Sequence, residues 1–422
     1  MIIQFDEKYK SFPKEEYELH VEKLQTEMKK MNLDLLLLTS PENIYYSTGY
    51  RSWYTSSLFR PVYVLVPLEG DPAVILRILE KSTVKFTSWT SNVFVSGTKA
   101  RNIGYLDAES HIEATKKAID QIAPSAKTIG IEKADGCQFF WSLQMLEDFA
   151  QKYPQYEFVD GTLAFQRARM IKTPWEIEKI RSVCYITEKA IEETFAMVRP
   201  GQTTEKEIAR SIASKMAADG VDKFSYLTVT SGIQKYTTLN AYATDRIVQF
   251  GELLLVDISG HIDGYASDLT RMMYLGNEIP KDIYDMAKAS SDCVIAGKEY
   301  MKPGRKIGAL NKTIEDTLRN AGYSDYVIHS SGHCVGLNVV EYPTIYDESD
   351  VMLEPGMVFA VENGVYPFDK EDGAENMHLA FRMEDEVLVT EHGSEWITGP
   401  GKAIYCLKDF KQKKFYEIKN DL

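Results

Sequence analysis

The sequence is short of cysteine and histidine and has no long apolar run. Its five cysteines are scattered and form no C-x-x-C pair, which excludes a disulfide scaffold and is typical of a reducing cytoplasm. Apolar runs such as Leu35–Leu38 are far shorter than the about 20 residues of a membrane span. The first ten residues carry charge where a signal peptide would be apolar. We therefore expect a cytoplasmic protein that does not cross a membrane.

Positive charge is also in deficit. The chain has 48 Lys and Arg residues against 62 Asp and Glu residues, which gives a net charge of −14. Such a surface repels phosphate backbones and anionic lipids, so nucleic acids and membranes are not expected partners. The hydrophobic share of 44 % and the charged share of 26 % are those of a globular protein. The length of 422 residues allows roughly two to four domains.

Helical and strand-like patterns alternate through the first 165 residues, which predicts a small α/β domain. Apolar residues recur among charges over Glu15–Met31, as in an amphipathic helix, and Leu33–Thr39 follows as a buried strand. Val62–Val66 and Ala73–Leu76 are predicted to form a strand pair across the turn Gly70-Asp71-Pro72.

The pattern changes after residue 165. Thr173 is typical of a helix N-cap and Pro174 of a first helical residue, so a long helix is predicted over Glu176–Met197. We therefore expect two domains, residues 1–165 and 166–422.

The second half contains a weak internal repeat. MVRPGQTTEKEIARSIASKMAADG (197–220) resembles MKPGRKIGALNKTIEDTLRNAG (301–322), and in the first copy Thr204 and Glu207 have the spacing of a capping box. The two segments either share their Pro-Gly and closing Gly positions by chance or belong to a duplicated α+β domain with a site between its halves.

Two aspartates lie close to one another in the most informative segment, residues 253–273. A buried apolar strand ends at Asp257, and a glycine-containing turn leads to a second strand with Asp268. Their spacing suits two facing strands of a hairpin. Paired carboxylates repel unless a proton or a cation lies between them. From the pair alone, a metal site and two turn-capping aspartates both remain open.

Three further residues favour the metal site. His333 lies between glycines in SSGHCVGL, where small neighbours suit the close approach of a ligand, and Glu362 and Glu384 lie within apolar strands. A carboxylate is costly to bury without a counter-charge. Four carboxylates and one imidazole suit Mn²⁺, Fe²⁺, Co²⁺ or Zn²⁺, and they can neutralise and bridge two such ions.

Together these motifs resemble the pita-bread metallopeptidases, which include prolidase, aminopeptidase P, methionine aminopeptidase and the metal-free relative creatinase. The matching motifs are D-x10-D-L-T-R, G-H-x-x-G-L, L-x-P-G-M-V-F-x-x-E-x-G-x-Y and R-x-E-D. The resemblance covers about residues 165–400. It implies a carboxy-terminal pita-bread α+β domain with an internal pseudo-two-fold repeat, behind a small amino-terminal α/β domain.

The resemblance also implies roles for individual residues. Two divalent metal ions, Mn²⁺ first and Co²⁺, Fe²⁺ or Zn²⁺ as alternatives, would be held by Asp257, Asp268, His333, Glu362 and Glu384. Glu362 would also take a proton from the attacking water and pass it to the leaving nitrogen. Thr270 and Arg382 would lie just behind the ligands. A catalytic role is implied for His329, and substrate contacts for Arg382 and Glu341.

The amino-terminal half resembles the same group. SPENIYYSTGY (40–50) and SLFRPVYVLV (57–66) look like the amino-terminal domains of creatinase and prolidase. Arg60 stands where creatinase-like enzymes hold a substrate carboxylate, for which a guanidinium fork is suited. A surface arginine on a strand edge is the alternative. The resemblance further implies a homodimer in which one amino-terminal domain completes the other subunit's site.

Two positions depart from the peptidase pattern. Asn240 and Val340 stand where peptidases of this group have histidines, although Glu341 and Pro343 of the H-E-x-P motif are present. Those histidines contact the scissile amide or stabilise its oxyanion, and valine cannot donate a hydrogen bond. Asn240 is retained as a substrate-contact candidate. Replacement donors are sought among His378, Tyr242 and Tyr265.

Three functions follow from these observations. The first is a dinuclear metal hydrolase that cleaves an amide or related C–N bond of a small carboxylated substrate, most like an Xaa-Pro dipeptidase. The second is a non-peptide hydrolase or a lyase acting on a small zwitterionic metabolite, because both histidines are replaced. The third is a binding protein without catalysis. The complete set of metal ligands argues against this third function.

Overall fold

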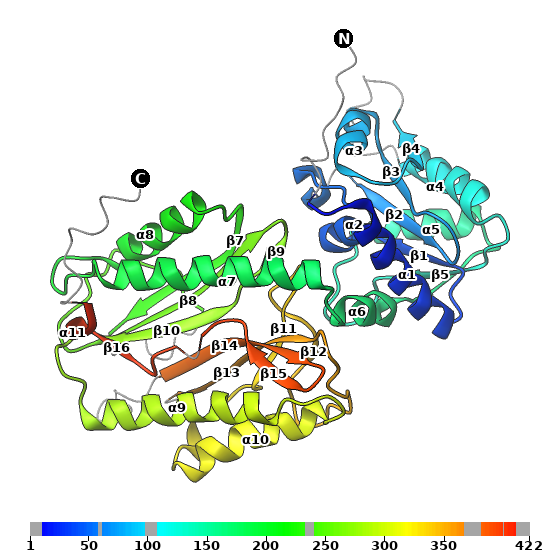
Figure 1. Ribbon diagram of the computed structural model, residues 1–422. Coiled ribbons are helices and arrows are strands. Elements are labelled where there is room, and N and C mark those ends of the chain that lie inside the picture. Colours follow the sequence, from blue (N-terminus) through cyan, green and yellow to red (C-terminus); the bar gives the residue numbers. More distant parts are fainter. Residues whose placement is uncertain are drawn as a thin grey trace. The chain divides into compact units, whose positions relative to one another are not determined.

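The computed structural model describes residues 11–57, 61–97, 108–232, 240–366, 381–399 and 401–410. The chain divides into two compact units, residues 1–169 and 170–422, each with its own sheet and helices (Figure 1). This mixed α/β architecture confirms the predicted fold class. No helix within the described ranges is long and apolar enough to span a bilayer.

The first unit is a six-stranded mixed sheet with helices on both faces. The strands, in the order β4-β3-β2-β1-β5-β6, are β1 (Leu35–Leu38), β2 (Tyr63–Pro67), β3 (Ala73–Arg77), β4 (Val93–Ser96), β5 (Thr128–Ile131) and β6 (Glu157–Asp160). The helices are α1 (Lys14–Lys30), α2 (Pro41–Thr48), α3 (Lys81–Thr87), α4 (Ala108–Ile122), α5 (Leu143–Lys152) and α6 (Thr162–Met170), with short 3-10 turns at Trp53–Ser56 and Ile78–Glu80. The predicted helix and strands are confirmed, and β2 pairs antiparallel with β3 as expected.

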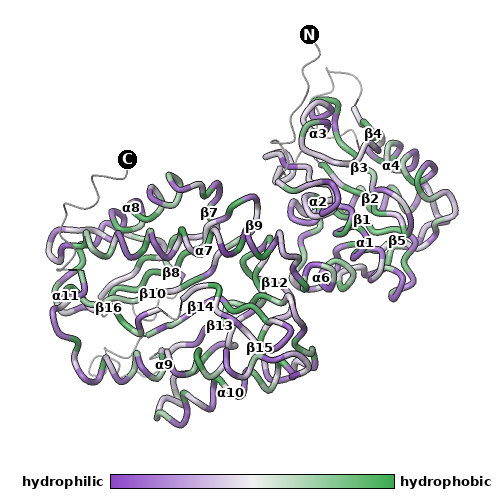
Figure 2. The backbone as a smooth tube through the Cα atoms, in the orientation of Figure 1, coloured by the Kyte–Doolittle hydropathy of each residue, from purple (hydrophilic) through white to green (hydrophobic). Residues whose placement is uncertain are grey.

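Strand alternation explains the layering of this unit. Leu35 and Leu37 belong to a buried cluster with Ile119 of α4 and Phe149 of α5. Because successive side chains of a strand point to opposite faces, Leu36 points to the other face, and α1 and α2 contact the sheet through β2. In Figure 2 the central strands are accordingly green, and the helices carry both colours.

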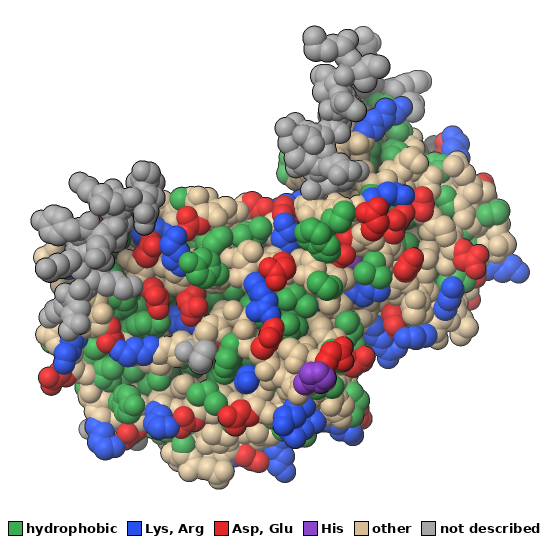
Figure 3. All heavy atoms as spheres, viewed as in Figure 1, with side chains coloured by type: hydrophobic (Ala, Val, Ile, Leu, Met, Phe, Trp, Pro, Cys, Tyr) green, Lys and Arg blue, Asp and Glu red, His purple; other side chains and the backbone are tan. Residues whose placement is uncertain are grey.

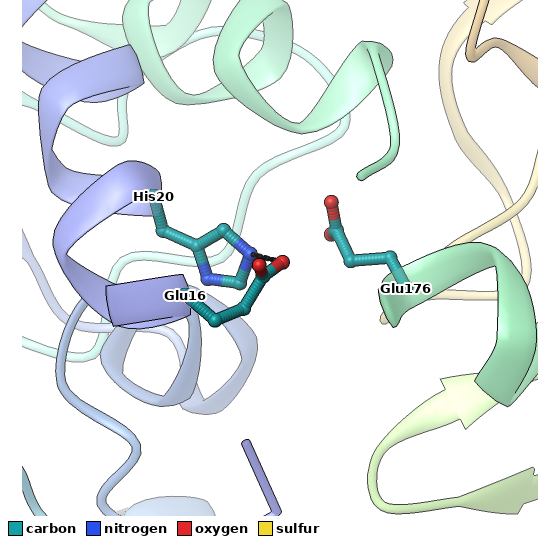
Figure 4. Close-up of side chains that lie close together, drawn as sticks. All are labelled: Glu16, His20 and Glu176. Atoms are coloured by element: carbon teal, nitrogen blue, oxygen red, sulfur yellow. Dashed lines mark ion pairs between the residues drawn. The ribbon is translucent and has the colours of Figure 1, made fainter. Parts of the chain in front are cut away.

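A buried histidine ties α1 to α2 within the first unit. His20 Nδ1 donates to the Tyr46 carbonyl oxygen at 3.0 Å, and the two rings stack with their centroids 4.1 Å apart. Its Nε2 lies 3.2 Å from a carboxylate oxygen of Glu16, one turn earlier on α1 (Figure 4). His20 thus has structural partners on both sides of its ring.

The second unit is built on a ten-stranded sheet. Its main path runs β12-β11-β13-β14-β10-β8-β7. The strands are β7 (Lys223–Ser231), β8 (Leu253–Ile262), β9 (Tyr265–Ala266), β10 (Leu269–Tyr274), β11 (Gly332–Cys334), β12 (Glu341–Thr344), β13 (Val358–Val365), β14 (Phe381–Thr390), β15 (Gly393–Trp396) and β16 (Tyr405–Cys406). The helices are α7 (Pro174–Phe195), α8 (Glu205–Ala218), α9 (Lys281–Tyr300), α10 (Ile307–Asn320) and α11 (Leu407–Phe410), with a 3-10 turn at Ser324–Tyr326.

This unit is duplicated. Two helices followed by strands (α7, α8, β7, β8, β10) recur as α9, α10, β11, β13 and β14, and the halves meet where β10 pairs antiparallel with β14. The Pro-Gly segments before α8 and α10 also bond alike. Gly201 N–H donates to Val248 O at 2.7 Å, and Gly304 N–H donates to Leu353 O at 2.8 Å. The internal repeat predicted from the sequence is therefore structural rather than accidental.

The helices cover the outer face of the sheet (Figure 1). Leu254, Val256 and Ile258 of β8 pack in one cluster with α7 and α8, whereas Phe359 and Val361 of β13 pack in another with α9 and α10. Residues of the opposite parity on each strand point to the inner face. Polar residues at those positions are thereby gathered on one side.

Charges of both signs intermix over the face drawn in Figure 3. The net charge of −14 is therefore not concentrated on that face.

We expect Thr173→Ala to lower the free energy of unfolding by about 1 kcal/mol, because an N-cap hydroxyl satisfies a helix N–H that would otherwise be unpaired. Thr173 is the N-cap of α7, as predicted, and it forms a complete capping box with Glu176. The measurement is urea unfolding followed by circular dichroism. Thr313→Ala on α10 is the matched control, since that hydroxyl bonds only the carbonyl one turn back. Equal losses in both variants would contradict the cap.

Candidate metal centre

A single row of residues crosses the inner face of the second sheet. Backbone pairing places Thr228 beside Asp257, Asp257 beside Thr270, Thr270 beside Glu384, and Glu384 beside Glu362. Five strands thus bring three of the predicted carboxylates into one line. Asp268, two residues before Thr270, lies on the same face by strand parity. The antiparallel pairing of β8 and β10 agrees with the predicted hairpin, but the residue directly opposite Asp257 is Thr270, and Asp268 lies just before β10.

His333 enters the row from β11, where it pairs with Ala360, two residues before Glu362. Its Nε2 lies 3.6 Å from Asp268 Oδ2 and 3.8 Å from Glu362 Oε1. The Nδ1 lies 3.1 Å from the Cys334 carbonyl oxygen. Because a carbonyl can only accept, Nδ1 carries the proton in this contact, and Nε2 is the ring nitrogen on the side of the carboxylates.

The glycine before His333 serves strand pairing rather than ligand approach. At Gly332, where φ is +124°, a Cβ would lie 2.0 Å from the Ala360 carbonyl oxygen. Only glycine lets β11 lie this close to β13, and that pairing holds His333 beside Glu362.

These side chains line one cavity of about 450 Å³. All five predicted ligands, Asp257, Asp268, His333, Glu362 and Glu384, contribute to it. The other lining residues include Thr228, Asn240, Tyr242, Val339, Val340 and Arg382. Its base is thus made of carboxylates, and its rim holds Tyr242 and Val340, whose exposed fractions are 87 % and 58 %.

Burial and mutual repulsion destabilise the ionised forms of these carboxylates. Burial first, and then the charge of Asp257, raises the pKa of Asp268 well above its usual value. Burial and the charge of Asp268 do the same to the pKa of Glu384, and burial raises the pKa of Asp257. Close negative charges in a low-dielectric site each disfavour ionisation of the others.

Protein groups satisfy these carboxylates only in part. Arg382 Nη1 donates to Asp257 Oδ2 at 2.7 Å, and the Thr270 hydroxyl donates to Glu384 Oε2 at 2.7 Å. The Tyr226 hydroxyl donates to Asp268 Oδ1. Asp257 Oδ1 is buried and has no hydrogen-bond partner among the described residues.

The donor set fits divalent ions. Ligand atoms of Asp268, His333 and Glu384 lie within 4.8 Å of one another. An ion would satisfy the orphaned oxygen of Asp257 and relieve the repulsion that raises the carboxylate pKa values. Carboxylate oxygen and imidazole nitrogen are the ligands that Mn²⁺, Fe²⁺, Co²⁺ and Zn²⁺ take in proteins.

Several residues singled out in the sequence lie away from the cavity lining. His329 bonds the Tyr366 hydroxyl at 2.9 Å through Nε2 and the Ser330 carbonyl through Nδ1. Glu341 is buried beside Lys172, with its Oε2 3.4 Å from Nζ, and its Oε1 accepts the Asn338 N–H. The hydroxyl of Tyr265 donates to Glu176 Oε1 at 3.0 Å.

Two candidates fall outside the described residues. These are Arg60 and His378.

Sequence reasoning missed Tyr226 and Val339. Tyr226 lies on β7, two residues before Thr228, so both point into the cavity. Its place in the cavity follows from the pairing of β7 with β8, which the local sequence of β7 does not indicate. Burial raises the pKa of Tyr226 well above its usual value, so its hydroxyl stays protonated and can donate to Asp268.

Comparisons with known proteins match both units. Residues 178–391 match the model of metallopeptidase family M24, and residues 20–171 match the creatinase/prolidase amino-terminal domain. An Xaa-Pro dipeptidase of Lactobacillus helveticus is 30 % identical over 92 % of this chain and 98 % of its own length. An Xaa-Pro dipeptidase of Pyrococcus furiosus is 28 % identical over 90 % of this chain and 97 % of its own.

Among solved structures, an Xaa-Pro dipeptidase from Bacillus anthracis superposes with a TM-score of 0.77 at 22 % identity. The match covers 93 % of this chain and 100 % of that one, and it shows the shared fold.

The chain therefore belongs to metallopeptidase family M24 and carries a creatinase/prolidase amino-terminal domain. It is a metal-dependent hydrolase, and its cofactors are divalent metal ions.

We expect divalent metal to stabilise the protein more at pH 8 than at pH 5. The folded-state pKa values of Asp268 and Glu384 are raised, so the metal-free protein keeps their full contribution only below the unfolded values of about 4 and loses it as pH rises. Bound metal removes that loss, with a gain of about 2.7 kcal/mol per site at a hundred times Kd. The measurement is the melting temperature of chelator-treated protein with and without Mn²⁺.

Asp268→Asn should flatten the pH dependence of the metal-free protein, because an amide does not titrate. An equal gain in melting temperature at both pH values would contradict the proposed repulsion among the buried carboxylates.

Proposed function

We propose that the protein is an Xaa-Pro dipeptidase, which hydrolyses the amide bond before proline in a dipeptide. The observation that carries this proposal is that one sheet brings all five predicted ligands to a single cavity, four from β8, β11, β13 and β14 and Asp268 from directly before β10. The curated relatives matched over nearly their whole length are named Xaa-Pro dipeptidases. A cavity of about 450 Å³ suits a substrate of dipeptide size.

Two divalent ions, preferably Mn²⁺, would be held by the five lining ligands, Asp257, Asp268, His333, Glu362 and Glu384. Four carboxylates supply the negative charge that two divalent cations neutralise. His333 would bind through Nε2, because its Nδ1 proton is engaged by the Cys334 carbonyl. When bound, the ions would lower the pKa of the attacking water and polarise the scissile carbonyl.

The protein's own groups would orient and transfer the proton. Glu362 is partly open to the cavity, with 15 % of its side chain exposed, so it can accept a proton from water and give it to the proline nitrogen. Arg382 Nη1 lies 2.7 Å from Asp257 and 3.8 Å from Glu362 Oε2. It would hold both carboxylates in position while the proton moves.

The remaining roles stay proposals from the family resemblance. Arg60 would bind the free carboxylate of the substrate, Asn240 would contact it at the rim, and His329 would act through Tyr366 at the side of the site. Glu341, paired with Lys172, would shape the wall behind Asn338. We further propose a homodimer and a cytoplasmic location. A non-peptide substrate, suggested by Asn240 and Val340, is not favoured by the relatives.

The direct test is proline release from a panel of Xaa-Pro dipeptides by Mn²⁺-loaded protein, with metal content measured on the same sample. We expect turnover of about 1 s⁻¹ or faster, the low end of ordinary kcat values, and two metal equivalents. Asp268→Ala should lose at least one equivalent and the activity, whereas Asp350→Ala, whose side chain is 88 % exposed, should keep both. Two bound metals without proline release would reject the dipeptide substrate.

Restoring the two histidines should accelerate the reaction. In Asn240→His with Val340→His, two donors face the cavity from its rim, and one oxyanion donor is worth about 2.7–4 kcal/mol in other hydrolases. We expect kcat for Xaa-Pro dipeptides to rise at least about 100-fold. Val339→His, one residue away in the same wall, is the matched control. A double variant no faster than the parent would mean that the rim is built for a different substrate geometry.

A further inference from the structure

Glu205, the first residue of α8, is a fully buried carboxylate outside the cavity lining. Its Oε1 accepts the Ser231 N–H at 2.9 Å and the Ser231 hydroxyl at 3.0 Å. Its Oε2 accepts the Thr244 N–H at 3.1 Å and the Thr244 hydroxyl at 2.6 Å. Each oxygen thus holds one residue with two hydrogen bonds, which together use the roughly four acceptor sites of a carboxylate.

The two residues held by Glu205 are the end of β7 and a near neighbour of two residues of the cavity rim. Ser231 is the last residue of β7, and Thr244 lies two residues beyond Tyr242. Asn240 and Tyr242 line the cavity. Tyr242 also makes an antiparallel backbone bridge to Thr228, the neighbour of Asp257 in the carboxylate row. Glu205 therefore fixes where the rim lies relative to the metal ligands.

Backbone contacts strengthen the same connection. Glu205 N–H donates to the Arg246 carbonyl at 3.0 Å, and Lys206 N–H donates to the Thr244 carbonyl at 3.0 Å. The Arg246 guanidinium in turn donates to the Ser231 hydroxyl at 2.8 Å. A carboxylate is also favoured at a helix N-terminus by the helix dipole.

The other half of the duplicated unit has no equivalent carboxylate. Helix α10 begins with Ile307, whose side chain cannot accept a hydrogen bond. In that half Asn311 of α10 accepts the Ser331 N–H through Oδ1 at 3.0 Å and donates to Asp347 through Nδ2 at 2.8 Å. A neutral amide thus holds the loop there, whereas the half that carries Asn240 and Tyr242 uses a buried carboxylate that accepts four hydrogen bonds.

We propose that Glu205 is a positioning residue for substrate binding, a proposal that rests on the proposed dipeptidase activity. By holding Ser231 and Thr244, it keeps Asn240 and Tyr242 at the distance from the metal ligands that a dipeptide requires. Neither metal binding nor proton transfer passes through it. It therefore acts on KM rather than on kcat.

The test is the kinetics of Glu205→Gln, which keeps the side-chain shape but turns an NH₂ group toward a backbone N–H donor. We expect KM for Xaa-Pro dipeptides to rise about ten-fold or more, the effect of losing hydrogen bonds to a charged acceptor, with kcat within about two-fold and metal content unchanged. Glu207→Gln is the matched control, because its carboxylate is on the same helix and, within the part of the chain that the structure describes, accepts hydrogen bonds from Thr204. An unchanged KM in Glu205→Gln would overturn the inference.

A double-mutant cycle separates positioning from general stability. If Glu205 acts through the rim, Glu205→Gln in a Tyr242→Ala background should raise KM no further than Tyr242→Ala alone. Fully additive effects would mean that Glu205 acts elsewhere.

Hydrogen exchange tests the anchoring without relying on activity. Amides of residues 240–252 should exchange faster in Glu205→Gln than in the parent, with β8 and β10 unchanged and Glu207→Gln equal to the parent in that segment. Unchanged exchange would refute the positioning role even in a fully active enzyme. Faster exchange in a protein that releases no proline would instead reject the proposed function and leave Glu205 as the anchor of the rim.

Discussion

The main physical constraint on the second unit is that strand pairing holds buried carboxylates side by side although they repel one another. Asp257, Glu384 and Glu362 cannot move apart without breaking strand pairs, because each is fixed by the register of its neighbours. Arg382 brings a positive charge to the lining of the cavity, too little for four carboxylates. Uncompensated burial costs several kcal/mol per ion. The sheet is therefore a scaffold whose inner face is stabilised by protons at low pH and by bound cations at higher pH.

Duplication explains how such a scaffold arises from simple parts. Each half supplies two acidic residues from its central strands or directly beside them, and the halves join where β10 meets β14. The base of the cavity is accordingly close to symmetric. Its rim is not, since α8 begins with the buried carboxylate of Glu205, whereas α10 begins with the apolar Ile307. A symmetric base suits the binding of two like ions, and an asymmetric rim suits the recognition of a substrate that differs at its two ends.

Local signals predicted much of this structure. The capping boxes at Thr173 and Thr204 follow from residues close in sequence. Acidic residues within apolar strands are recognisable as functional candidates because burying a carboxylate is energetically costly. The partners of Tyr226 and Glu205 could not be read in this way. Tyr226 reaches Asp268 over 42 residues, and Glu205 reaches Thr244 over 39. Such contacts depend on strand pairing and loop paths, which hydrophobic periodicity does not encode.

The two missing histidines bear on rate more than on reaction type. One oxyanion donor contributes about 2.7–4 kcal/mol, so two contribute about 5–8 kcal/mol, whereas enzymes lower activation barriers by about 8–23 kcal/mol in total. Metal ions held at the base of the cavity, which keeps every candidate ligand, would activate the attacking water and polarise the carbonyl of the substrate. Replacing donors at the rim with Asn240 and Val340 thus removes a part of transition-state stabilisation and leaves the hydrolytic step possible. The rim residues instead affect which substrates bind. An apolar Val340 favours contact with an apolar substrate side chain, whereas an imidazole at that position would favour a carbonyl oxygen.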